Sequence, residues 1–115
     1  MPLQPADKLR AICLALPGAT ETAMKRGPTY RIGDKIFAWD RQWGGGATVW
    51  LKVPEGVQGV LVGADPQRFF VPPFVGQKGW VGMRLDHRPD WKEVEALVRR
   101  SYRLIAPRRM GVVCD

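Results

Sequence analysis

The sequence predicts an α+β fold in which a single layer of helices packs on a twisted antiparallel sheet. Three observations support this prediction. Apolar residues recur with helical spacing near both ends of the chain. Between them lie short alternating segments separated by glycine-rich turns, without regular strand–helix–strand alternation. Strands that are grouped together and flanked by helices are typical of an antiparallel sheet covered on one face.

The helices are expected near the two ends and once in the middle. Residues 4–16 should form the first, because Leu9, Ile12, Cys13 and Leu16 repeat at helical spacing and Pro17 stops it. Residues 55–64 have helical spacing but three glycines, and we expect a short helix there. The last helix should follow Asp90, a suitable N-cap, and end before Pro107.

Three strands are expected between the first and middle helices, and one or two between the middle and last helices. Residues 29–32 and 35–39 flank Gly33-Asp34, a two-residue turn with the glycine that a tight hairpin favours. Residues 47–53 follow a triple glycine, and residues 80–85 form a later strand. In the third of these strands Val49 and Leu51 should face the core, with Trp50 and Lys52 on the opposite face.

Residues 69–80, here called the aromatic ledge, are the most unusual segment. Pro72-Pro73 fixes two backbone angles and removes two hydrogen-bond donors, and phenylalanines lie on both sides of it. Such a rigid apolar segment is either a corner of the core or a contact surface, and the sequence leaves both interpretations open.

Size and composition predict one soluble domain, residues 1–115. A chain of 115 residues with 45% hydrophobic content can bury its own core. No apolar run is long enough to span a membrane, and the first residues lack the pattern of a secretory signal. Cys13 and Cys114 have no paired spacing, so we expect reduced thiols and a cytoplasmic protein.

Several short motifs together resemble the MmcQ/YjbR family of small bacterial proteins, which are described as DNA-binding. The resemblance is carried by residues 16–22, 33–38, 69–76, 79–81 and 101–104. It implies a frataxin-like (CyaY-like) α+β layer, also described as a double-wing arrangement, and a role in binding DNA. Many relatives carry a histidine or lysine before the proline of the first strand, where this chain reads Lys25-Arg26-Gly27-Pro28. No role of that histidine is therefore carried over.

The net charge of +7 favours a polyanionic partner, and nucleic acid is the commonest one. Basic residues alternate with tryptophans on the predicted strands, a pattern suited to phosphate and base contacts. The alternative is that the tryptophans fill the interface with the helices and that the C-terminal arginines complement the helix dipole. The predicted nucleic-acid contacts are Lys25, Arg26, Lys35, Trp50, Lys52, Lys78, Arg84, Arg108 and Arg109.

An enzyme is not expected. His87 is the only histidine, no serine or cysteine lies near it in sequence, and Cys13 falls on an apolar helix face. The triple glycine at 44–46 lacks the lysine of a phosphate-binding loop, and the 11 acidic residues are scattered rather than clustered for a metal. We therefore predict no cofactor and no metal.

A second hypothesis is a binding module for a small molecule or a protein partner. Its apolar cleft would be walled by Tyr30, Phe37, Phe74 and Trp80, with Arg84 as an anion anchor. In either case we expect a monomer that does not bind membranes, and the sequence does not distinguish DNA from RNA.

Overall fold

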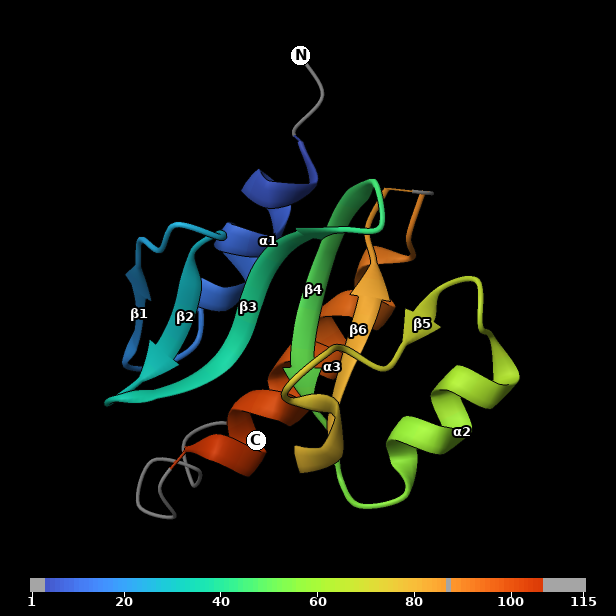
Figure 1. The fold of residues 1–115 in the computed structure, drawn as a ribbon. Helices are drawn as coiled ribbons and strands as arrows, with labels where there is room; N and C mark the ends of the chain where they lie inside the picture. Colours follow the sequence, from blue (N-terminus) through green and yellow to red (C-terminus); the bar gives the residue numbers. More distant parts are fainter. Residues whose placement is uncertain (1–3, 87, 107–115) are drawn as a thin grey trace.

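A six-stranded antiparallel sheet with helices on one face forms the domain. The computed structural model describes residues 4–86 and 88–106. The elements run α1 (Pro5–Leu14), β1 (Ala19–Thr22), β2 (Thr29–Ile32), β3 (Lys35–Trp43), β4 (Gly46–Lys52), α2 (Val57–Ala64), β5 (Phe69–Phe70), a 3₁₀ turn η1 (Gly76–Lys78), β6 (Trp80–Arg84) and α3 (Trp91–Ile105). The strand order is β1-β2-β3-β4-β6-β5 (Figure 1). Within the described residues, no helix is long and apolar enough to cross a membrane.

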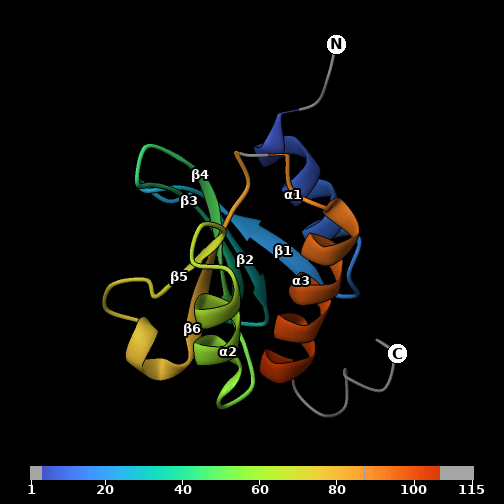
Figure 2. The ribbon, with the colours of Figure 1, turned by 90° about the vertical axis from the view of Figure 1, so that its right-hand side faces the viewer.

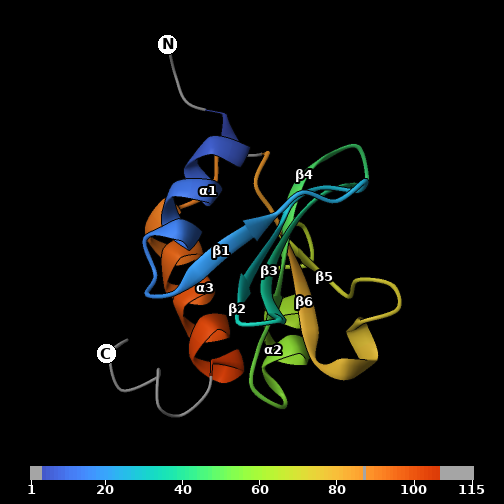
Figure 3. The same cartoon turned by 90° about the vertical axis from the view of Figure 1, so that its left-hand side faces the viewer.

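The helices α1 and α3 lie on the same side of the sheet, as the two side views show (Figures 2 and 3). Leu9 and Cys13 of α1 and Val94 and Val98 of α3 are fully buried against the sheet. The predicted α+β class, with one layer of helices on an antiparallel sheet, is confirmed.

A buried serine on α3 fixes the helix to two neighbouring strands. The hydroxyl of Ser101 donates to the carbonyl of Phe37, at 2.6 Å, and accepts from the backbone N–H of Lys52, at 2.9 Å. The pairing of β2 with β3 shifts register beside Phe37, at the Tyr30/Arg31 step, which leaves a backbone carbonyl free for this contact. The next residue, Tyr102, donates its hydroxyl to the carbonyl of Pro17.

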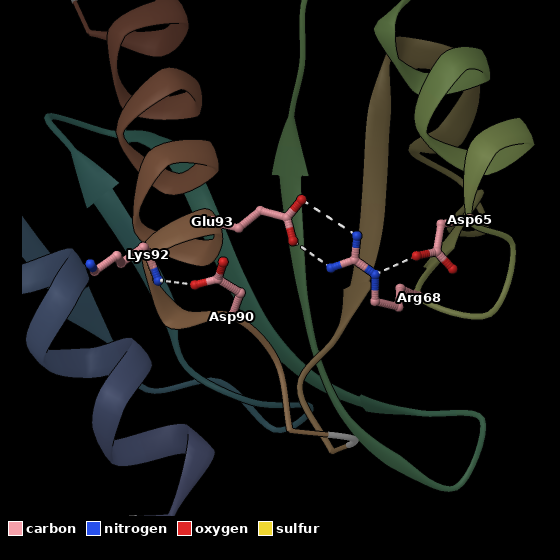
Figure 4. Close-up of polar contacts among 5 residues, drawn as sticks. All are labelled: Asp65, Arg68, Asp90, Lys92 and Glu93. Carbon is pink, nitrogen blue, oxygen red and sulfur yellow. Dashed lines mark hydrogen bonds and ion pairs between the residues drawn. The ribbon is translucent and has the colours of Figure 1, made fainter.

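Helix α3 begins at the residue the sequence predicts. The Asp90 carboxylate accepts from the Lys92 backbone N–H at 3.0 Å, which satisfies one of the free donors of the first turn (Figure 4). Glu93, one residue further, pairs with both terminal nitrogens of Arg68, and the Nε of Arg68 lies 2.5 Å from Asp65. Arg68 therefore connects the end of α2 to the start of α3 (Figure 4).

Three boundaries differ from the prediction for identifiable reasons. The first helix ends at Leu14, two residues before the predicted end. The middle helix starts at Val57, because the preceding Gly56 has a left-handed φ of 86° that a helix excludes. The strand predicted at 35–39 continues to Trp43. The short strand β1 was not expected, and β5 is the second of the one or two strands expected after the middle helix; an Ala-Thr-Glu-Thr segment and a Phe-Phe pair carry little strand pattern of their own.

Candidate nucleic-acid interface

The side of the sheet opposite α1 and α3 is here called the open face. Its members follow from strand register: Trp39 pairs with Trp50, Arg41 with Thr48, and Lys52 with Trp80, so each pair lies on one face. The open face consists of Thr20, Thr22, Thr29, Arg31, Ile36, Trp39, Arg41, Trp43, Gly46, Thr48, Trp50, Lys52, Phe70, Trp80, Gly82 and Arg84.

The charged strand positions of this face are all cationic. Arg31, Arg41, Lys52 and Arg84 are cations, and no strand position of the face is acidic. Carboxylates lie at its margins: Asp86, just beyond β6, packs against Gly46, and Glu55 lines a cavity together with Lys52 and Lys78. On the helix side, by contrast, Arg10 forms an ion pair with Glu21 at 2.7 Å. The cations at the strand positions of the open face thus have no acidic residue among those positions, whereas Arg10 on the helix side is paired with one.

A cluster of aromatic rings fills the centre of the open face. The ring of Trp50 lies edge-on to Trp39 at 5.6 Å, to Trp43 at 5.7 Å and to Phe70 at 6.4 Å between centroids. Gly82 makes room for Phe70, because a Cβ at that position would overlap the ring. Trp50 is 0% exposed as a result. The prediction that Trp50 contacts nucleic acid is therefore wrong: its neighbours cover it completely.

Arg41 is stacked within the same cluster. Its guanidinium carbon lies 4.4 Å from the ring centroid of Trp50, 4.8 Å from that of Trp39 and 5.6 Å from that of Trp43. The residue is only 6% exposed, and its Nε is buried without a hydrogen-bond partner. Burial lowers the pKa of Arg41, and the neighbouring charge of Arg26 lowers it further. The indole N–H groups of Trp39 and Trp50 are likewise buried and unpaired.

Three predicted cations lie on or beside the open face, and their side chains have more hydrogen-bond donors than the contacts described here use. Arg84 sits over the Phe70 ring at 5.6 Å and donates to the carbonyl of Trp43 at 3.2 Å. The ammonium of Lys52 donates to the backbone carbonyl of Lys78, and both lysines line a cavity of about 680 Å³. The position of Lys52 lies four residues along β4 from the residue paired with Arg84, a separation of about 13 Å along the strand.

The remaining predicted cations lie at the ends of the strands. Lys25 and Arg26 are exposed in the β1–β2 connection and border a second cavity with Arg41 and Trp43. Lys35 is exposed at the start of β3, beside the Gly33-Asp34 turn. The predicted contacts Arg108 and Arg109, as well as His87 and Cys114, lie outside the described residues.

The alternative apolar cleft is wrong as predicted, because its residues do not meet. Tyr30 and Phe37 are buried on the helix side, where Phe37 packs edge-on against Tyr102 at 5.3 Å. Trp80 lies on the open face, and Phe74 is 80% exposed. Each interpretation of the aromatic ledge holds for a different residue. Phe69 is buried in the core, whereas Phe74 projects outward with a left-handed φ of 68°.

Chemistry at Cys13 is disfavoured by its surroundings. The thiol is fully buried, and desolvation raises its pKa, so the nucleophilic thiolate is suppressed. Among residues 4–86 and 88–106, no group of three possible metal ligands comes together.

Sequence reasoning missed Arg31, Trp39 and Arg41 as members of the open face. The signal for two of them was present, since Trp39, Arg41 and Trp43 alternate with period two. The predicted strand ended at Trp39, which removed Arg41 from consideration. Arg31 lies between two buried residues of β2 and has the same alternating pattern.

Comparison with known proteins places the fold and the family. The family model described as YjbR matches residues 14–104. A crystal structure of Deinococcus radiodurans protein DR2400, which carries a DUF419 domain, superposes with a TM-score of 0.78 and 22% sequence identity, covering 96% of this chain and 90% of that one. No curated protein matches the chain. Since the matched segment includes α3, all six strands and the end of α1, the chain belongs to the YjbR family.

Proposed function

We propose that this protein is a non-enzymatic nucleic-acid-binding domain that binds the phosphate backbone with its open face. DNA is the partner we favour, at low sequence specificity, in a cytoplasmic monomer. The observation that supports the proposal most directly is the distribution of charge: cations and aromatic rings occupy the strand positions of the open face, and carboxylates do not.

The spacing of the accessible cations suits a nucleic-acid strand. Lys52 and Arg84 mark two levels about 13 Å apart, which corresponds to about four phosphates of one DNA strand at about 3.4 Å each along the axis. Lys78 lies beside Lys52, and Lys25 and Arg26 lie beside Trp43. Trp43, which is 39% exposed, offers a ring face on which a base or sugar can stack.

The accessible part of this face lies around its buried aromatic centre, where Trp50 and Arg41 are covered. The chain between β5 and η1 and the β3–β4 hairpin both project on the side away from α1 and α3 (Figures 2 and 3). The chain between β5 and η1 crosses in front of β6 toward the end of β4, and the β3–β4 hairpin lies at the other end of these strands (Figure 1). A strand of nucleic acid lying between them would meet the cations named above.

The direct experiment is a fluorescence-anisotropy titration of the protein into labelled oligonucleotides. Duplex DNA, single-stranded DNA and RNA of one sequence should be compared at about 50 and 200 mM salt, because phosphate contacts release counterions. We expect binding that weakens steeply with salt and depends little on base sequence. Binding that is absent at low salt, or that does not respond to salt, would refute the proposal.

A further inference from the structure

The cavity beside Trp43 has an unusual electrostatic composition. It measures about 600 Å³ and lies between the β1–β2 connection, the last residues of β3 and the first turn of α1. Three cations border it: Lys25 and Arg26, which are exposed, and Arg41, which is 6% exposed. One wall is Trp43.

The charge of Arg41 is not offset by an acid. No ion pair or carboxylate hydrogen bond of Arg41 is found in the described part of the chain, and the neighbouring charge that acts on it is that of another cation, Arg26. Asp40 also lines the cavity, but it pairs with Val49 and so belongs to the helix side. Burial raises the pKa of Asp40, and the charge of Glu21 raises it further.

A buried guanidinium without an anion is costly, and stacking on tryptophan recovers only part of that cost. Arg41, whose Nε is buried without a hydrogen-bond partner, contributes to the lining of a cavity that two further cations border. A dianionic group in the cavity would compensate all three cations at once, and a guanidinium is well suited to hold phosphate oxygens.

We infer that this cavity is a phosphate-binding site, in which Arg41 with Arg26 and Lys25 holds one phosphate group and Trp43 covers the attached sugar or base. The inference rests on the proposed function when the phosphate belongs to nucleic acid, and it gives that function an anchoring point. A purely structural role for Arg41, packed only on the tryptophans, would not explain why Lys25 and Arg26 border the same cavity.

The test uses ¹⁵N-labelled full-length protein, with inorganic phosphate and a short oligothymidylate as separate probes. The NMR signals of the Arg41 Nε–H group and the Trp43 indole N–H are followed at constant ionic strength, and conservative variants Arg41→Lys and Trp43→Phe assign them. We expect both probes to shift both signals in a saturable manner. The exposed double variant Lys25→Gln/Arg26→Gln should weaken phosphate binding at least about tenfold, since charge-assisted hydrogen bonds are lost.

The matched control is Lys92→Gln/Arg100→Gln, which removes the same charge from exposed positions of α3. Its phosphate affinity should stay within about twofold of the parent, since rim charges far from a site contribute little. Equal weakening in the two double variants would overturn the inference. An Arg41 signal that ignores phosphate while the oligonucleotide still binds would overturn it as well and leave the proposed function standing. A phosphate response without oligonucleotide binding would support the site and remove the proposed function.

Discussion

The assignment of the open face predicts how the protein should respond when three of its cations are removed. The variant Lys52→Gln/Lys78→Gln/Arg84→Gln keeps side chains of similar length but removes three positive charges beside β4 and β6. Lys52 and Arg84 each donate one hydrogen bond to a backbone carbonyl, yet an ammonium has three donors and a guanidinium five. Donors therefore remain for phosphate oxygens.

The expected change in the salt dependence of binding follows from counterion release. One phosphate contact on duplex DNA contributes about 0.9 to the slope of log affinity against log salt, so three contacts contribute about 2.7. The triple variant should show a slope less steep than the parent by about that amount. On single-stranded DNA the corresponding loss should be about 2.1, at about 0.7 per contact.

The assay is fluorescence anisotropy at several salt concentrations, with a control of equal charge. The control variant Lys92→Gln/Arg99→Gln/Arg100→Gln removes three exposed cations from α3, on the other side of the sheet. Its slope should change by less than about 0.9, the value for a single contact. If both triple variants lose the same slope, net charge rather than the open face drives binding, and the reasoning fails.

The remaining predictions concern stability and are checked by thermal and denaturant unfolding. Asp40→Asn should stabilise the fold at pH 7, because burial raises the pKa of Asp40 and so makes its ionised form unfavourable in the folded state. The gain in stability should vanish as the pH falls below the pKa of a free aspartate, and a pH-independent effect would contradict this explanation. Phe74→Gly should raise the free energy of unfolding by about 0.5–1 kcal/mol, since glycine relieves the left-handed φ of 68° and the ring is exposed; a loss of stability would show that the ring is packed. Arg68→Lys should cost about 1 kcal/mol by breaking the fork to Glu93, with faster amide exchange in α2, and unchanged exchange would argue against the link.

The fold was predictable because its strongest signals are local. The capped amphipathic helix after Asp90, the Gly33-Asp34 hairpin and the alternation around Val49 and Leu51 each fix an element without knowledge of the rest. The strand β1 was not predictable and β5 only as an open alternative, since both form because a neighbouring strand offers hydrogen-bond partners.

The candidate site was only partly predictable, and the errors have one cause. Alternation places Trp50 on the face opposite the core, but it does not tell whether that face is wet. Here Trp39, Trp43 and Phe70 come from other strands and bury it. Sequence periodicity identifies faces, whereas burial on a face depends on the side chains that neighbouring strands bring to it.

The most direct test of the central claim is a map of backbone amide shift changes when ¹⁵N-labelled protein binds a duplex oligonucleotide. We predict that the shifted signals belong to β3, β4, β6 and the β1–β2 connection, on the open face. Signals of α1 beyond its first turn, which borders the cavity beside Trp43, and of the solvent-facing side of α3 should stay in place. Shift changes concentrated on α1 and α3 would contradict the account.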